Sequence, residues 1–155
     1  MLSCIISCII EGMGIDEAIE QAISFARDMD GNCECVDIVE KAVKLSKDDL
    51  VDTDAIRMLG EGWASDEALA IAIYSSLKYK DDFKKALICS VNHDGDSDST
   101  RAICGNILGA YLGIDNIPKE WVDVIELKEL LENISIDLLT GYEESEEWFK
   151  KYSKN

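Results

Sequence analysis

Apolar residues in this chain recur with the period of an α-helix over almost its whole length, and this restricts the fold more than any other feature. Between residues 15 and 29 they stand at i, i+3, i+4, i+7, i+8 and i+11, which places them on one helical face. Residues 35–45 repeat the pattern, so both segments are expected to be outer amphipathic helices. The single proline, Pro118, stands where a helix would begin. The sequence therefore predicts an all-α protein.

The segment 67–77 departs from this pattern because it is apolar or small on almost every side. Such a segment is typical of a helix buried at the centre of a fold. Its small residues recur at every fourth position and would let a neighbouring helix approach closely; they are Ala68, Ala72 and Ser76. A second run with this spacing consists of Gly105, Gly109 and Gly113. Because each glycine weakens a helix by up to ~1 kcal/mol, we expect these three to mark a close contact with another helix backbone or with a ligand.

The first ten residues, MLSCIISCII, are almost unbroken in their hydrophobicity. They are too few to span a bilayer, which needs about 20 apolar residues. They also lack the basic region and the cleavage site of a signal peptide. We therefore expect a buried helix whose remaining apolar face is an aggregation risk or a docking surface. A homodimer that covers residues 1–10 is one form such docking would take.

The chain is strongly acidic, with a net charge of −17 from 32 acidic and 15 basic residues. This charge argues against a nucleic-acid partner held through its phosphates, and it favours attraction of cations. The six cysteines and one histidine form no zinc pattern, because no Cys-x-x-Cys pair is present. Since nothing indicates secretion, we expect reduced cysteines, a cytoplasmic location and no membrane partner.

The segment NHDGDSDST, residues 92–100, places three carboxylates and three hydroxyls within nine residues. Carboxylates about 4 Å apart repel by roughly 1 kcal/mol in water and nearer 4 kcal/mol at a protein surface. Crowding them favours a bound hard cation, because magnesium and calcium take oxygen ligands. An EF-hand is excluded, since the glycine and glutamate that its loop requires are absent from the corresponding positions. The competing interpretation is a solvated acidic turn in which Asp or Ser caps the next helix.

Three longer runs resemble the ADP-ribosylglycohydrolase family, which includes the dinitrogenase reductase-activating glycohydrolases. SVNHDGDSDSTRAICGNILGAYLG, residues 90–113, is similar to the family's C-terminal signature. GEGWASDEALAIAIYSSLKY, residues 60–79, resembles its Gly-x-Gly loop and the helix after it. IPKEWVDVIE, residues 117–126, resembles its closing segment. The resemblance covers residues 60 to about 139, whereas residues 1–47 match only as generic helices.

The resemblance implies a compact multi-helix bundle like the C-terminal half of the glycohydrolase fold. We expect a single partial domain over residues 1–142, with the N-terminal half of the family fold absent, followed by a charged tail over residues 143–155. That tail has some helical character, and Trp121 and Trp148 are expected to be packing anchors.

The family resemblance assigns metal ligands to the acidic segment. It implies a two-metal centre for Mg²⁺ or Mn²⁺, in which Asp96 and Asp98 are ligands and Ser99 supplies a neutral oxygen. His93 could support the site, although a loop histidine with its own hydrogen-bond partners is the simpler interpretation. Arg101 stands where a small residue is expected and would compete with cations if it faced the metals.

The resemblance also assigns substrate contacts to the Gly-x-Gly loop. In the family this loop lines the ADP-ribose cleft, which implies that Gly60, Gly62 and Trp63 bind substrate. By itself the Gly-x-Gly pattern is a weak signal that most often marks a turn before a helix. A tryptophan at the start of a buried helix is also more often part of the core than a ligand contact.

The chain departs from the family in one respect that bears on activity. Relatives complete the metal centre with an N-terminal Thr-Asp-Asp motif and a nearby acidic residue. Here Asp52-Thr53-Asp54 has a different order, and Asp48-Asp49 lacks the preceding threonine. We therefore expect half of the metal ligands and identify no catalytic residue in this chain.

The function implied by the resemblance is metal-dependent hydrolysis of the glycosidic bond between ADP-ribose and a protein side chain. The chain is expected to be incomplete by itself. Its expected partners are ADP-ribose or an ADP-ribosylated protein, and a separate N-terminal glycohydrolase half. The alternative is a non-catalytic helical remnant or binding module with a weak site for a divalent cation or ADP-ribose.

Overall fold

The computed structural model describes residues 1–29, 31, 33–141 and 144–152, and over these residues it contains helices and no strands, which confirms the all-α prediction. The chain packs into two compact units, residues 1–118 and 119–155. The domain extent predicted from the sequence, residues 1–142, stays a prediction.

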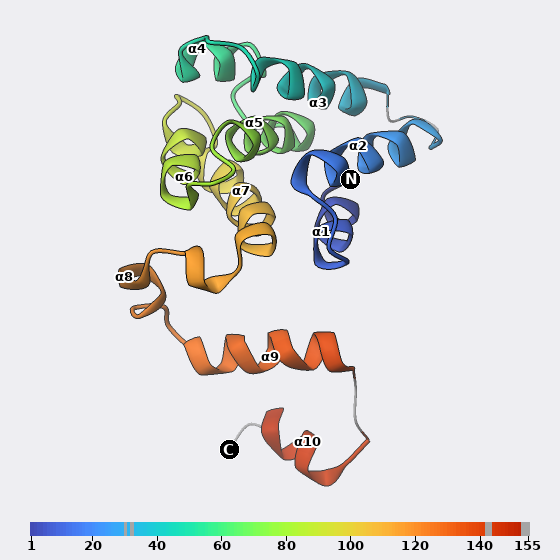
Figure 1. The fold of residues 1–155 in the computed structure, drawn as a ribbon, viewed down its shortest axis with the longest axis vertical. Coiled ribbons are helices and arrows are strands. Elements are labelled where there is room, and N and C mark those ends of the chain that lie inside the picture. Colours follow the sequence, from blue (N-terminus) through green and yellow to red (C-terminus); the bar gives the residue numbers. More distant parts are fainter. Residues whose placement is uncertain (30, 32, 142–143, 153–155) are drawn as a thin grey trace. The chain divides into compact units, whose positions relative to one another are not determined.

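The helices of the first unit follow one another with short connections (Figure 1). They are α1 (Leu2–Ile10), α2 (Ile15–Arg27), α3 (Cys33–Leu45), α4 (Asp52–Arg57), α5 (Ser65–Lys78), α6 (Phe83–Val91), α7 (Ser97–Leu112) and the short 3₁₀ helix η1 (Ile114–Asn116). The second unit contains α8 (Lys119–Val122), α9 (Lys128–Thr140) and α10 (Glu146–Tyr152). Helix α8 begins directly after Pro118, as expected.

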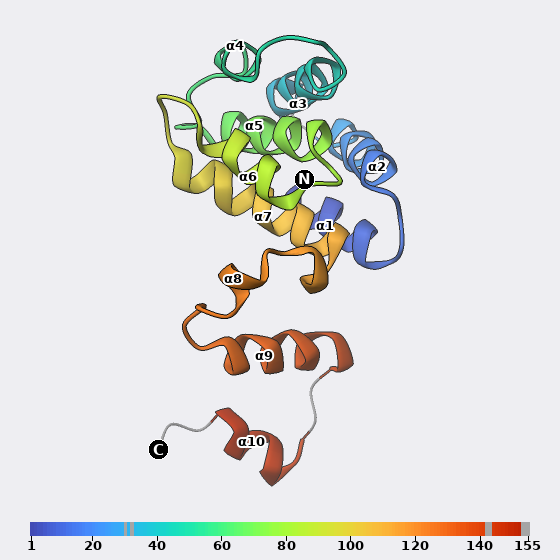
Figure 2. The ribbon, with the colours of Figure 1, turned by 60° about the vertical axis from the view of Figure 1, so that its left-hand side comes forward.

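Helix α5 is the buried centre of the first unit. Every residue from Ala68 to Ser76 is buried, which confirms the prediction for this segment. The helix packs against α3, α6 and α7, and both ribbon views show it between α3 and α7 (Figures 1 and 2). Its small side chains make direct contacts: the Ser76 hydroxyl donates to Cys104 Sγ of α7 over 3.4 Å, and the Ser75 hydroxyl donates to Cys89 Sγ of α6 over 3.4 Å.

The two outer amphipathic helices bury the faces that their periodicity predicts. Helix α2 buries all of its predicted positions, which are Ile15, Ala18, Ile19, Ala22, Ile23 and Ala26. In α3 the buried positions include Val36, Val39 and Ala42, while Val43 is half-buried. Helix α1 packs against α2 and α7. It buries Ile5 and Ile9 and leaves Ile10 exposed, so residues 1–10 form the predicted helix but bury only one face of it.

The expectation that three glycines of α7 mark a close helix contact is wrong. A Cβ atom added at Gly105 would meet Leu87 Cδ2 at an ordinary 3.8 Å, and one added at Gly109 would meet no described atom within 4 Å. Gly113 instead ends the helix, with a φ of +73° that side chains rarely adopt. The small residues that meet between α5 and α7 include Ser76 of α5 and Cys104 of α7.

The five cysteines whose side chains the structure describes are free thiols. Burial raises the pKa of Cys104 to about 11 and that of Cys89 to about 12, so both are protonated at neutral pH. Protonated, buried thiols behave as small hydrophobic groups. No helix in the described ranges is long and apolar enough to cross a membrane.

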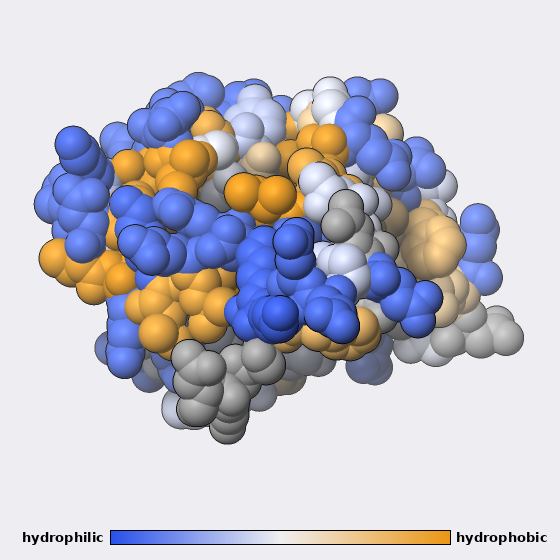
Figure 3. Space-filling view, turned by 90° about the horizontal axis from the view of Figure 1, so that it is seen from below, coloured by the Kyte–Doolittle hydropathy of each residue, from blue (hydrophilic) through white to orange (hydrophobic). Residues whose placement is uncertain are grey.

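An ion pair joins α9 and α10 within the second unit. Lys151 of α10 pairs with Asp137 of α9 at 2.9 Å. The rings of Trp148 and Phe149 pack edge to face with centroids 6.4 Å apart, and Trp121 and Trp148 are both half-buried. Hydrophobic residues reach the molecular surface between hydrophilic ones in Figure 3. The predicted charged tail thus contains a helix over its described residues.

Candidate functional site

The acidic loop, residues 92–98, includes the first two residues of α7, and Asp96 caps that helix. The backbone N–H of Ser99 donates to Asp96 Oδ1 over 3.4 Å, and the Ser99 hydroxyl donates to Asp96 Oδ2 over 2.8 Å. An aspartate at this position satisfies a helix N–H that has no partner within the helix. The capping role that the sequence left open is therefore present.

The predicted metal residues lie together at the start of α7. Hydrogen bonding of Asp96 with the side chain of Asp98 and then with Ser99 lowers the pKa of the Asp96 carboxyl. Asp98 is exposed, whereas Asp96 and Ser99 are half-buried. The N-terminus of a helix also favours the ionised form of a carboxylate. The structure thus brings two carboxylates and one hydroxyl into a single cluster of oxygen atoms.

The side chains of His93 and Thr100 hold the acidic loop in place through hydrogen bonds to its backbone and to Ser90. Thr100 is fully buried, and its hydroxyl donates to the carbonyl oxygen of Ser90 over 2.6 Å. His93 Nδ1 accepts from the N–H of Gly95 over 3.1 Å, so Nε2 carries the proton and donates to the Ser90 carbonyl over 3.1 Å. The structure therefore supports the simpler interpretation of His93, a loop histidine with its own partners.

The Gly-x-Gly loop, residues 60–63, is held by the first turn of α5. Glu67 Oε2 accepts from the backbone N–H groups of Glu61 over 3.2 Å and Gly62 over 3.0 Å. Gly60 and Gly62 have φ values of +121° and +80°, in a region that favours glycine. The two glycines therefore serve backbone geometry and the close approach of Glu67.

The two loops meet directly, although the sequence analysis treated them as separate sites. The backbone N–H of Asp96 donates to the carbonyl oxygen of Glu61 over 2.8 Å. A Cβ atom added at Gly95 would lie only 1.7 Å from the same oxygen. No residue with a side chain fits at position 95 unless one backbone moves, so Gly95 is a condition of this junction.

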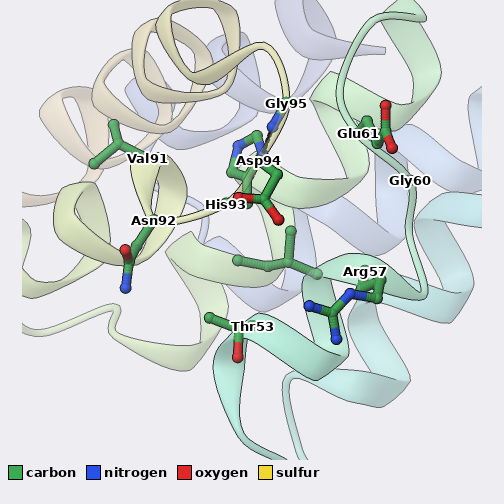
Figure 4. Close-up of a pocket in the computed structure, with 10 residues that line it drawn as sticks. Thr53, Arg57, Gly60, Glu61, Val91, Asn92, His93, Asp94 and Gly95 are labelled. Atoms are coloured by element: carbon green, nitrogen blue, oxygen red, sulfur yellow. Dashed lines mark hydrogen bonds between the residues drawn. The ribbon is translucent and has the colours of Figure 1, made fainter.

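A pocket of about 270 Å³ lies between the two loops and α4 (Figure 4). The acidic-loop residues that line it include His93, Asp94 and Gly95, and α4 contributes Thr53 and Arg57. The Gly-x-Gly loop contributes Gly60 and Glu61; Gly60 is thus the predicted site residue that lines this pocket.

The position of α4 depends on Asp52 at its first residue. Asp52 Oδ1 accepts from the hydroxyl of Tyr74 over 2.7 Å, and Oδ2 accepts from the hydroxyl of Tyr79 over 2.6 Å. Burial and the bond to Asp52 raise the pKa of Tyr74. The bond to Asp52 and burial likewise raise the pKa of Tyr79. Asp52 therefore attaches the pocket wall to the central helix α5.

The exposure of Trp63 corrects one interpretation from the sequence. Its side chain is 71% exposed, so the interpretation as a core residue is wrong. The indole Nε1 donates to Glu61 Oε2 over 3.1 Å, which fixes the ring beside the junction of the loops. Trp63 thus offers an open aromatic surface.

Arg101 is also exposed, on the first turns of α7.

Sequence reasoning missed three residues that assemble the site. Glu67 had a detectable signal, because an acidic residue in the first turn of a helix often bonds back to the N–H groups before it. Gly95 and the Glu61 carbonyl had none, since their contact depends on how two distant loops pack.

Comparisons with known proteins identify the family of this chain. A family model described as ADP-ribosylglycohydrolase matches residues 1–147. The chain belongs to the ADP-ribosylglycohydrolase family. The match includes the N-terminal helices, which from the sequence resembled the family only in a generic way.

Curated relatives match over shorter segments. An uncharacterised protein of Archaeoglobus fulgidus is 39% identical over 84 residues, 54% of this chain and 27% of the relative. The ADP-ribosyl-[dinitrogen reductase] glycohydrolase of Rhodospirillum rubrum is 44% identical over 48 residues, 31% of this chain and 16% of the relative. The ADP-ribosylarginine hydrolase Tri1 of Serratia proteamaculans is 34% identical over 85 residues, 55% of this chain and 22% of the relative.

The matched segments thus span about a quarter or less of the length of these three relatives. The comparison with solved structures finds no significant match.

Proposed function

We propose that this chain provides the cation-binding loop and the substrate-facing loop of a metal-dependent ADP-ribosylglycohydrolase. The reaction is hydrolysis of the glycosidic bond between ADP-ribose and a protein side chain. The observation that carries the proposal is the hydrogen bond of 2.8 Å between Asp96 N and the Glu61 carbonyl, because it joins the two loops that the family resemblance assigns to metal and substrate. Two relatives named for ADP-ribosyl-dinitrogen reductase and ADP-ribosylarginine support this substrate class.

The donor set at the start of α7 fits part of a magnesium or manganese site. Asp96, Asp98 and Ser99 offer only oxygen atoms, which are the ligands that these cations prefer. Over the described residues, no group of three or more His, Cys, Asp or Glu side chains could hold a metal ion. We propose that the remaining ligands come from a segment or chain that carries the Thr-Asp-Asp motif, which these 155 residues do not contain.

The residues of this chain then have distinct roles. Asp96 and Asp98 hold the divalent cations, with Ser99 as a neutral oxygen donor. Bound there, the cations supply Lewis-acid stabilisation and a template for the ribose hydroxyls and a water molecule. Trp63 presents its exposed indole to the nucleotide, and Gly60 contacts the substrate where it lines the pocket, while Gly62 shapes the loop from its buried position. The acid/base residue of the oxocarbenium-like cleavage comes from the segment with the Thr-Asp-Asp motif.

Removing the two loop carboxylates is expected to abolish cation binding. We expect wild type to bind Mn²⁺ weakly in calorimetry, and the double variant Asp96→Asn plus Asp98→Asn to show no binding heat. Asparagine keeps the helix cap while it removes both charges, so the fold is retained. The control Asp48→Asn plus Asp49→Asn removes the same charge from two exposed residues elsewhere. Identical traces for wild type and the loop variant would leave the acidic loop with a capping role alone.

The 155-residue chain alone is expected to release no ADP-ribose from ADP-ribosyl-arginine in the presence of Mg²⁺, because it holds only part of the ligand set. Chromatography of free ADP-ribose measures the release, and a glycohydrolase fragment that carries the Thr-Asp-Asp motif is expected to restore it. Robust release by the chain alone would show that the motif is not required. Binding of ADP-ribose with no release in either sample would favour the alternative, a non-catalytic binding module.

A further inference from the structure

Glu67 makes contacts that its position on the buried helix α5 does not require. Its carboxylate turns back from the first helical turn, and a single oxygen, Oε2, accepts from the backbone N–H groups of Glu61 and Gly62 at 3.2 and 3.0 Å. Hydrogen bonds to an ionised acceptor are stronger than those between neutral groups. The carboxylate therefore fixes two successive peptide groups of the Gly-x-Gly loop.

The glycines of this loop leave space for Glu67 and for the first turn of α7. A Cβ atom at Gly60 would lie 2.4 Å from the Glu67 carboxyl carbon, so any side chain there would displace the carboxylate. Gly62 is buried and would place a Cβ atom 3.1 Å from Thr100 Cγ2 and 3.3 Å from the Asp96 carbonyl oxygen. The loop is therefore packed between Glu67 on one side and the first turn of α7 on the other.

From Glu67 the bonds continue to the proposed cation ligand. The Gly62 N–H that Glu67 accepts over 3.0 Å shares one planar peptide group with the Glu61 carbonyl, and that carbonyl accepts the N–H of Asp96 over 2.8 Å. Asp96 is in turn bonded to Ser99 through both its side-chain oxygens. Three hydrogen-bonded steps thus connect a side chain on α5 to the oxygen cluster at the start of α7.

We infer that Glu67 is the positioning residue that couples the Gly-x-Gly loop to the acidic loop. Glu67 orients the peptide group of Glu61, and Glu61 orients Asp96, so either loop loses its ordered arrangement when the junction opens. The effect on ligands rests on the proposed function: occupancy of the Gly-x-Gly loop by ADP-ribose and occupancy of the acidic loop by a cation strengthen each other, because both need the same junction.

The test compares Glu67→Ala and Glu67→Gln with the control Asp66→Ala, which removes a carboxylate from the same helical turn. Amide hydrogen exchange followed by NMR reports on the junction without any ligand. In Glu67→Ala we expect amide exchange at Gly62 and Asp96 to accelerate roughly tenfold or more, because the charge-assisted hydrogen bonds to the carboxylate are lost. Exchange at Ile71 and Ile73 in the core of α5 is expected to stay unchanged. Glu67→Gln keeps an acceptor oxygen and is expected to restore most of the protection.

Titration with Mn²⁺, with and without ADP-ribose, then measures the coupling. We expect roughly tenfold weaker Mn²⁺ binding in Glu67→Ala and loss of the enhancement by ADP-ribose, with Asp66→Ala like wild type. Faster exchange at Gly62 with no change at Asp96 would overturn the inference, as would equal acceleration throughout α5. If wild type binds neither Mn²⁺ nor ADP-ribose, the proposed function fails while the exchange data still decide the role of Glu67. If Glu67→Ala does not fold, Glu67→Asp takes its place, because its shorter side chain withdraws the acceptor oxygen from the loop, and the same outcomes at Gly62 and Asp96 support or overturn the inference.

Discussion

Gly95→Ala is expected to lower the free energy of unfolding by about 2–4 kcal/mol and to separate the two loops. The added Cβ would lie 1.7 Å from the Glu61 carbonyl oxygen and 2.5 Å from its carbonyl carbon. Both atoms belong to the backbone, so no flexible side chain can move aside. The Asp96 N–H then loses its acceptor, and the peptide groups that met there are displaced. Cation binding at Asp96 and Asp98 is expected to weaken with the loss of this junction.

Urea denaturation of Gly95→Ala and Gly109→Ala measures this effect against a matched control. Gly109 lies within α7, the helix that follows the acidic loop, and a Cβ there meets no described atom within 4 Å. Its replacement is expected to be neutral or to stabilise the protein by up to ~1 kcal/mol, because alanine favours a helix more than glycine does. Equal stability of the two variants would contradict the close approach of Gly95 to Glu61.

Asp52→Ala is expected to lower the free energy of unfolding by about 2–3 kcal/mol. The substitution removes both acceptors of Tyr74 and Tyr79 and leaves the fully buried Tyr74 hydroxyl without the acceptor it now has. An unsatisfied buried polar group costs about 1–3 kcal/mol, and α4 loses its attachment to α5. The wall of the pocket that Thr53 and Arg57 form is then expected to lose its fixed position.

Thermal and urea denaturation of Asp52→Ala and Asp52→Asn separate these contributions. Asparagine keeps one carbonyl acceptor, and its amide can donate to the second hydroxyl, so its cost is expected to be about 1 kcal/mol. A second measurement is the free energy of unfolding at alkaline pH. Because the pKa values of Tyr74 and Tyr79 are raised in the folded state, their stabilising contribution is complete below the unfolded value of about 10 and is lost as pH rises above it. If Asp52→Ala has the same free energy of unfolding as wild type, the tyrosine hydroxyls have found other acceptors.

Asp52 has a structural role that the order of residues in its segment does not reveal. The order Asp52-Thr53-Asp54 excludes the family's Thr-Asp-Asp metal motif, and that interpretation needs only the sequence. The role of Asp52 as the acceptor of two tyrosines depends on α4 lying across the end of α5. Such a placement follows from packing between elements, which periodicity does not specify.

Trp63 and the glycines of α7 show the limits of single-helix reasoning in opposite directions. Trp63 precedes a buried helix and yet is largely exposed. It lies at the end of a loop whose backbone is hydrogen-bonded to Glu67. Gly105 and Gly109 have the spacing of a close helix contact and yet face ordinary or open space. In both cases the direction in which a side chain points is set by the neighbouring element.

The sequence by itself determined the all-α class and the buried central helix. Its two loop motifs also indicated membership of the ADP-ribosylglycohydrolase family. These properties depend on residue type and spacing along the chain, which set helical faces and loop chemistry locally. Only the tertiary structure decided that the Gly-x-Gly loop and the acidic loop contact each other. That contact depends on the Glu61 carbonyl entering space that only a glycine at position 95 leaves open, and Glu67 bonds to the N–H of the same peptide group. Contacts of this kind join distant residues through the backbone, so they leave little trace in the order of side chains.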